Sequence, residues 1–233
     1  GKANSLIRLT IGGFKVPPGA VLSVWFFKDW IAELMSDKNL KDMWGKPEHF
    51  KALGNLLKSN AENLLYSEEQ KSIIYAVLKE HKSSKLFAVR SSSPEEDLEG
   101  ASFAGGYETL LGVNEENILD AVKKAFISCM DERVFFYKSQ NGFDTSVLRI
   151  AVVIQEQIAS DISGVGFSLN PLNNCYDEAV INANSGLGES VVSGMITPDE
   201  YVVNKNTKII IERKIGSKEQ AIILDINGGT RII

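Results

Sequence analysis

The spacing of apolar residues changes along the chain, and this change is the strongest constraint on the fold. From about Val24 to His81 the apolar residues recur at helical spacing, most clearly in SVWFFKDWIAEL and SEEQKSIIYAVLKEH. Ser67 with Gln70 predicts a capping box at the start of the second run. After Gly142 the chain consists mainly of short β-type runs, such as LRIAVVIQEQI and TKIIIERKI. Helices and strands are therefore grouped and do not alternate evenly, which favours a two-lobed α+β domain over a doubly wound sheet.

This grouping predicts two lobes. Residues 1–143 would form an N-terminal lobe with the helical segment, a strand and a glycine-rich loop, and residues 144–233 a strand-rich C-terminal lobe, incomplete at its end. A chain of 233 residues, 44% of them apolar, is long enough to bury a core. Asn227-Gly228-Gly229 predicts a tight turn between two strands. The sequence starts with GKANSL and ends on GGTRII, where this hairpin is still in progress, so we interpret it as a fragment of a longer protein.

Composition narrows the classes of function. A net charge of −5 argues against general nucleic-acid binding, which requires a basic surface. No apolar run is long enough to span a membrane, so no membrane partner is expected. The two cysteines are far apart and neither belongs to a metal-type pair, which predicts a reduced, cytoplasmic location. The two histidines, His49 and His81, stand in polar sequence, and we expect both on the solvated surface rather than in catalysis.

The segment LFAVRSSSPEEDLEGASFAGGYET, residues 86–109, combines a strand, a cation and a glycine-rich turn. Arg90 stands where the strand becomes polar, and a guanidinium offers a fork of donors that suits phosphate oxygens. A salt bridge to one of the following acids, Glu95, Glu96 or Asp97, is an equally good interpretation. Backbone N–H groups at Gly105 and Gly106 suit an anion, but most Gly-Gly pairs are only turns. No Gly-Lys-Ser/Thr follows, so this is not a Walker-type loop.

Three further stretches carry open alternatives. Lys2, before a predicted helix, is either a point charge for a phosphate or a solvated surface residue. The strand AVVIQEQIASD turns polar at residues 155–158, where its backbone could face a flat heterocycle, or its outward residues are simply polar. NSGLGESVVSG is either an anion site at a helix start or a helix start with no binding role.

Taken together and in order, these blocks are more specific than any of them alone. The blocks are GKANSL…GFKVPPG, FAVRSSSPEED…ASFAGGYET, VVIQEQI…SGVGFSLNP and GLGESVVSGMITPDEY. The chain resembles the ATP-binding, ATP-grasp-like domain of the phosphoenolpyruvate synthase and pyruvate phosphate dikinase family, a domain that rifampin phosphotransferases also carry. The resemblance covers almost the whole chain.

The resemblance implies a role for each block. Lys2 and Arg90 would contact the ATP phosphates and act as catalytic residues. The 102–109 loop would cover the phosphates, and the strand end would form the adenine-facing hinge. The implied nucleotide-binding residues are Lys2, Arg90, Ser102, Gly105, Gly106, Thr109, Gln155, Glu156, Gln157 and Ile158. ATP and Mg²⁺ would bind between the lobes. The metal ligands of the family would lie beyond residue 233, so none is expected in this fragment.

The resemblance also implies partners and a reaction. A swivelling domain with a phosphorylated histidine would receive the terminal two phosphates, leaving AMP. A later step would pass the β-phosphate to pyruvate, held by an acceptor-binding domain, giving phosphoenolpyruvate. Both domains would belong to the same full-length protein. Another acceptor, such as rifampin or a glucan, is the alternative, as is a non-catalytic module of the same fold. The chain departs from the family pattern at Pro94, at Gly106 in place of glutamine, and at Ser185 in place of tryptophan.

Overall fold

The structure is a computed structural model that describes residues 1–81, 85–93, 97–98, 101–102 and 107–233. It divides into two compact units, Gly1–Gln157 and Ile158–Ile233. This division falls later than the lobe boundary expected after residue 143. The reason is that the strand β6 (Ala151–Glu156) pairs with strands of the first unit, so the chain leaves that unit only after β6 ends.

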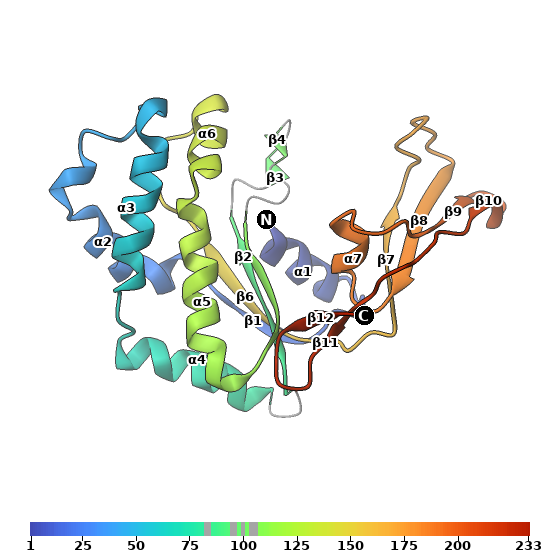
Figure 1. Cartoon of the computed structure of the whole chain (residues 1–233), viewed down its shortest axis with the longest axis horizontal. Helices are drawn as coiled ribbons and strands as arrows, with labels where there is room; N and C mark the ends of the chain where they lie inside the picture. Colours follow the sequence, from blue (N-terminus) through green and yellow to red (C-terminus); the bar gives the residue numbers. More distant parts are fainter. Residues whose placement is uncertain (82–84, 94–96, 99–100, 103–106) are drawn as a thin grey trace. The chain divides into compact units, whose positions relative to one another are not determined.

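The first unit is built around a four-stranded antiparallel sheet (Figure 1). Its strand order is β1-β6-β2-β5, with β1 at Gly19–Leu22, β2 at Phe87–Ser92 and β5 at Thr109–Val113. The neighbours β6 and β2 are more than fifty residues apart in sequence, so the centre of the sheet depends on a long-range pairing. A separate two-stranded pair joins β3 (Asp97–Leu98) to β4 (Ala101–Ser102).

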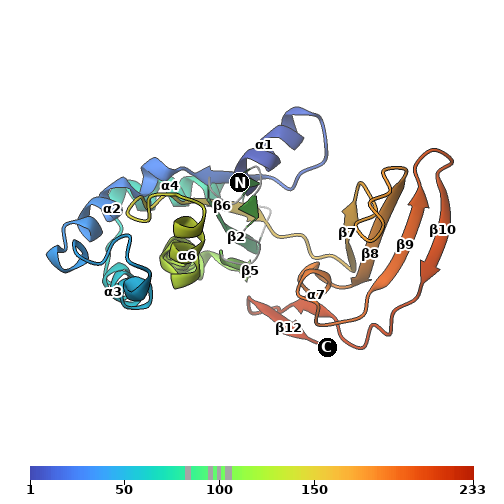
Figure 2. The ribbon, with the colours of Figure 1, turned by 90° about the horizontal axis from the view of Figure 1, so that it is seen from above.

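Six α-helices accompany this sheet in the described part of the first unit. They are α1 (Lys2–Ile11), α2 (Lys28–Met35), α3 (Phe50–Glu62), α4 (Glu68–Glu80), α5 (Ile118–Ile127) and α6 (Glu132–Gln140). Helix α5 packs on β2, β5 and β6 and closes one face of the sheet. Figure 2 shows α1 and α6 on opposite sides of the sheet. The helical segment predicted for residues 24–81 is therefore confirmed.

The core lies between α5 and its neighbouring helices and the covered face of the sheet. Strand residues that alternate inward, such as Val89, Val152 and Ile154, are fully buried there. The large side chains that fill the core are Phe27, Phe50, Phe126, Met130 and Phe135. Phe126 stacks on Phe27 at a centroid distance of 4.9 Å, which ties α5 to the segment before α2.

The second unit is a four-stranded antiparallel meander with a hairpin after it. Its strands β7 (Ile162–Phe167), β8 (Glu178–Ser185), β9 (Asp199–Asn204) and β10 (Ile209–Lys214) follow one another in space as they do in sequence. A short helix α7 (Glu189–Val192) comes between β8 and β9, and β11 (Ile222–Leu224) pairs with β12 (Thr230–Ile232). The tight turn predicted at Asn227-Gly228-Gly229 joins the last two strands, and both glycines have positive φ. The α+β class predicted from the sequence is confirmed.

No helix in the described part of the chain combines the length and the apolar character needed to traverse a bilayer.

The start of α4 provides a test of the fold. Ser67 accepts a hydrogen bond from the Gln70 backbone N–H, and the Gln70 side chain accepts one from the Ser67 N–H, as the sequence predicts for a capping box. Ser67→Ala should lower the free energy of unfolding by about 1 kcal/mol, measured by chemical denaturation. Ser72→Ala, at an exposed position within the same helix, is the matched control and should change it by no more than about 0.5 kcal/mol. Equal losses in both variants would contradict the role of the cap.

Candidate functional site

The register of β2 against its neighbours gathers polar residues on one face of the sheet. Arg90 lies opposite Val153 of β6 and opposite Thr109 of β5, while Ala88 lies opposite Gln155. Directly opposed residues of an antiparallel pair point to the same face. Arg90, Thr109 and Gln155 therefore share the face that α5 does not cover. Arg90 and Gln155 are offset by two residues along the strands, which is about 7 Å.

Helix α1 begins where β2 ends. The Ala3 backbone N–H donates a hydrogen bond of 3.1 Å to the Ser92 hydroxyl, and Ser92 is on the same strand face as Arg90. The contact at Gly1 is so close that a Cβ there would meet the Ser93 carbonyl oxygen. Lys2 is thus held beside the polar end of β2. The first turn of α1 contains no acidic residue, so the positive end of the helix dipole adds to the charge of Lys2 and Arg90.

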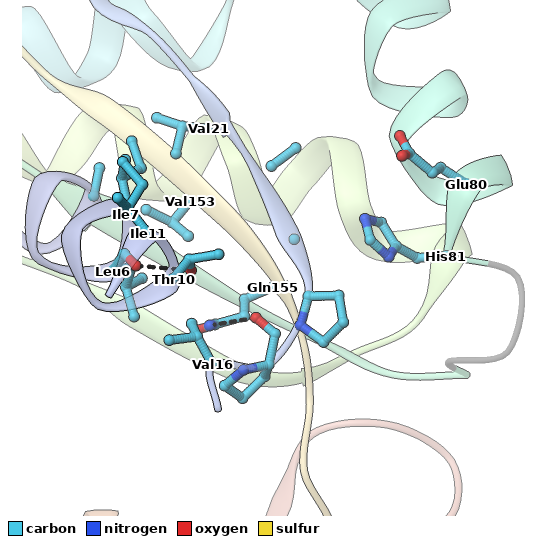
Figure 3. A pocket seen from close by; sticks show the side chains of 15 residues that line it. Leu6, Ile7, Thr10, Ile11, Val16, Val21, Glu80, His81, Val153 and Gln155 are labelled. Carbon is cyan, nitrogen blue, oxygen red and sulfur yellow. Dashed lines mark hydrogen bonds between the residues drawn. The ribbon is translucent and has the colours of Figure 1, made fainter. Parts of the chain in front are cut away.

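A cavity of about 450 Å³ lies between α1 and the uncovered face of the sheet (Figure 3). Apolar side chains supply most of its wall, and Figure 3 shows Leu6, Ile7 and Ile11 of α1 on the same side of the cavity as Val153. Thr10, Gln155, Glu80 and His81 are the polar residues that line it. An apolar cavity with a few polar groups at its edge is the usual form of a small-molecule site.

The end of β6 is fixed by bonds to the segments on either side of it. The Glu156 N–H donates to the Pro18 carbonyl oxygen at 2.8 Å, and the Gln157 N–H donates to that of Leu86 at 3.0 Å. The Gln155 side-chain amide donates to the carbonyl oxygen of Pro17 at 2.9 Å, a bond drawn in Figure 3. The proline pair that precedes β1 is thereby held against the end of β6.

Because of Pro18, one backbone carbonyl oxygen at the end of β6 receives no hydrogen bond from β1. The pairing of Gly19 with Gln155 places Pro18 directly opposite Glu156. An antiparallel pair of this kind normally exchanges two hydrogen bonds, but proline has no N–H and cannot return one to the Glu156 carbonyl oxygen. The Glu156 carbonyl oxygen therefore lacks the hydrogen bond that this pairing would normally supply from β1.

Comparison with known proteins decides the family. The family model described as the pyruvate phosphate dikinase AMP/ATP-binding domain matches residues 1–232. The chain belongs to this family of ATP-binding domains. The resemblance to the phosphoenolpyruvate synthase and pyruvate phosphate dikinase family predicted from the sequence is confirmed.

Several curated relatives are similar over most of the chain. A probable phosphoenolpyruvate synthase of Methanocaldococcus jannaschii is 34% identical, over 100% of this chain and 20% of its own length. The phosphoenolpyruvate synthase of Pyrococcus furiosus is 39% identical, over 84% of the chain and 24% of its own length. An uncharacterized phosphotransferase of Bacillus subtilis is 38% identical, over 94% of this chain and 25% of its own length. The chain thus spans about a quarter or less of the length of these relatives.

The structure brings together some of the predicted site residues. Lys2, Arg90, Thr109 and Gln155 lie on or beside one sheet face, and Glu156 and Gln157 complete the strand end. Ile158 is the first residue of the second unit. Ser102 is described only by its place in β4, and Gly105 and Gly106 lie outside the described residues. The salt-bridge alternative for Arg90 also falls outside them, because the side chains of Glu95, Glu96 and Asp97 are not described. The roles of these residues stay predictions.

The NSGLGESVVSG stretch lies in the second unit. Its Gly186 has a φ of +79°, and the Gly186 carbonyl oxygen accepts hydrogen bonds from the hydroxyls of Ser160 at 3.2 Å and Ser163 at 2.7 Å. The helix that follows, α7, has only four residues. These features give the stretch a structural role as a tight connection between β8 and α7, while its role as an anion site stays a prediction.

Sequence reasoning did not assign a role to Ser92, Pro18 or Gly19. The signal for them was present in the quoted VRSS and VPPG blocks, but only the register shows that they meet the start of α1 and the end of β6. Gly19 is a particularly close contact, because a Cβ there would meet the Ile154 carbonyl oxygen and lie 2.7 Å from the Gln155 Cα.

Gly19→Ala should therefore separate β1 from β6 and lower the free energy of unfolding by about 1–3 kcal/mol in chemical denaturation. Gly166→Ala is the control: a Cβ at Gly166 meets nothing within 4 Å, so that variant should unfold within about 0.5 kcal/mol of the unmodified chain. A neutral Gly19→Ala variant would show that β1 moves away from β6 without cost, contrary to the contact described here.

Proposed function

We propose that this domain binds ATP on the uncovered face of the sheet in the first unit, with the triphosphate at Arg90 and Lys2 and the base at the end of β6. The observation that carries the proposal is the β2–β6 register. It puts Arg90, a cation suited to phosphate, on the same sheet face as Gln155, about 7 Å away along the strands and one residue before the carbonyl that would bind the base. The family is an AMP/ATP-binding domain, so the ligand class is fixed independently of this geometry.

Two cations and a helix start would hold the phosphates. The guanidinium of Arg90 would form charge-assisted hydrogen bonds with phosphate oxygens, and Lys2 would add a point charge at the positive end of α1. Such groups act most strongly where charge develops during transfer, so they would stabilise the transition state more than the bound nucleotide. The 102–109 loop, Gly105 and Gly106 included, would cover the phosphates.

The strand end would select the base. The Glu156 carbonyl oxygen, which Pro18 cannot satisfy, would accept a hydrogen bond from the 6-amino group of adenine, and the Ile158 backbone would contribute a second polar contact. The apolar wall of the cavity beside Gln155 suits the faces of a purine. Because backbone atoms make these contacts, the side chain of Gln157 would contribute less than the course of the main chain.

Mg²⁺ accompanies ATP in the proposed function, with its protein ligands beyond residue 233. No group of three or more His, Cys, Asp or Glu side chains among them is arranged to hold a metal ion.

The remaining steps are proposed for the longer protein. The terminal two phosphates of ATP would pass to a histidine on a separate swivelling domain, leaving AMP. The outer phosphate would then leave to water as inorganic phosphate, and the phosphate remaining on the histidine would pass to the enol oxygen of pyruvate on an acceptor-binding domain, giving phosphoenolpyruvate and free histidine. The names of the relatives support this reaction, and the chain spans only a fraction of their length. The chain itself contains two histidines, and His81 lies at the base end of the cavity rather than beside Arg90. We propose that the protein acts in the cytoplasm.

Arg90→Ala tests the phosphate end. In the full-length enzyme it should lower phosphoryl transfer by about a hundredfold or more, because a donor to the developing charge is lost, and it should leave the melting temperature nearly unchanged. Arg149→Ala, at an exposed position of the same unit, is the matched control and should keep normal turnover. Near-normal transfer in Arg90→Ala, or a large fall in its melting temperature, would favour a structural ion pair at Arg90.

Comparing ATP with inosine triphosphate tests the base end. The two nucleotides differ at the 6 position, where inosine has an oxygen that cannot donate to the Glu156 carbonyl. ATP should bind at least about tenfold more tightly in calorimetry, because the buried acceptor is left without a donor in the inosine complex. Gln157→Ala should preserve this ratio. Equal affinities for the two nucleotides would rule out recognition by the strand-end carbonyl.

A further inference from the structure

His81 forms a half-buried pair with Glu156. Its Nδ1 lies 3.1 Å from the Glu156 Oε1, and the two side chains are only 12% and 19% exposed. The sequence-based expectation that His81 is a solvated surface residue is therefore wrong. The reason is that α4 ends beside the end of β6, where Glu156 meets His81, and the polar sequence around His81 does not reveal this contact.

The pair joins two elements at the site of base binding. His81 caps the C-terminus of α4, where its own N–H donates to the carbonyl oxygens of Val77 and Leu78. Glu156 is the last residue of β6, immediately before Gln157 and the boundary of the first unit. His81 also lines the cavity, and Figure 3 shows its ring at the opposite end from the side chains of α1.

The contact with His81 adds to a backbone position that has fewer hydrogen bonds than usual in a strand. Its peptide gives one hydrogen bond to Pro18 and receives none in return, so the strand ladder holds it less firmly than an interior residue. A carboxylate bonded to an imidazole N–H in a half-buried setting supplies a stronger, charge-assisted contact. Because an ionised carboxylate can only accept, Nδ1 is the donor in this contact.

We propose that His81 is a positioning residue for base recognition: by holding the Glu156 carboxylate, it keeps the Glu156 carbonyl oxygen in the orientation that accepts from the 6-amino group of adenine. The inference rests on the proposed function of the same site. It predicts that His81 affects affinity for the base and not for the phosphates, since Arg90 and Lys2 contact a different part of the nucleotide.

The test uses this chain and four ligands in calorimetry: ATP, AMP, inosine triphosphate and inorganic tripolyphosphate. His81→Ala should lower the affinity for ATP and for AMP by about tenfold, which corresponds to the loss of one charge-assisted hydrogen bond. It should also reduce the preference for ATP over inosine triphosphate. Tripolyphosphate should bind within about twofold of the unmodified chain. His81→Asn should restore most of the loss, because its amide nitrogen can occupy the place of Nδ1 and asparagine is accepted at helix C-termini.

A double-mutant cycle separates the pair from other effects of the substitution. If His81 acts through Glu156, the His81→Ala and Glu156→Ala variants should show the same loss of base preference, and combining them should add little. Glu156→Ala also provides the comparison if His81→Ala does not fold, because it removes the same bond from the strand side.

Three outcomes would overturn the inference. The first is a His81→Ala variant with an unchanged preference for ATP over inosine triphosphate. The second is an equal loss of affinity for AMP and for tripolyphosphate in that variant, and the third is additive effects of the two substitutions in the cycle. An unmodified chain that binds neither ATP nor AMP would overturn the proposed function as well. An unmodified chain that binds ATP with the expected preference, together with variants that retain it, would overturn only the role of His81.

Discussion

The antiparallel pairing of β2 with β6 is the contact on which the proposed site depends. It joins strands that are more than fifty residues apart in sequence, and it sets which side chains face α5 and which face the cavity. A shift of one residue would turn Arg90 and Gln155 into the core and expose Val89 and Ile154. Burying a guanidinium in that core would be costly, so the apolar face fixes the register and the register assembles the site.

Much of this arrangement could be predicted from the sequence. Helical spacing identified the segment that becomes α2 to α4, the Ser67 capping box marked the start of α4, and the tight-turn glycines marked the hairpin at Gly228. These features depend on residues close together in the chain. The ordered family blocks located Arg90 and the end of β6, and the comparison with known proteins confirmed the family.

The parts that could not be predicted depend on contacts between distant segments. The compact units divide after Gln157, later than the boundary expected after residue 143, because β6 completes the sheet of the first unit and a β-type run does not reveal its partner strand. Pro18 lies opposite Glu156 because of the β1–β6 register, and no pattern within either segment predicts this pairing. His81 was judged by its polar neighbours in sequence, whereas its surroundings are set by where α4 ends in space.

Helix α4 has an exposed face and would ordinarily tolerate changes in length, yet its two ends are both fixed. Ser67 starts it with a capping box, and thirteen helical residues later His81 meets Glu156. An inserted or deleted residue would turn His81 by about 100° around the helix axis and move it about 1.5 Å along it. The number of residues in α4 therefore sets both the height of His81 along the helix and its direction around the helix axis. Relatives that keep the His81–Glu156 pair should have the same number of residues in this helix even where its exposed residues differ.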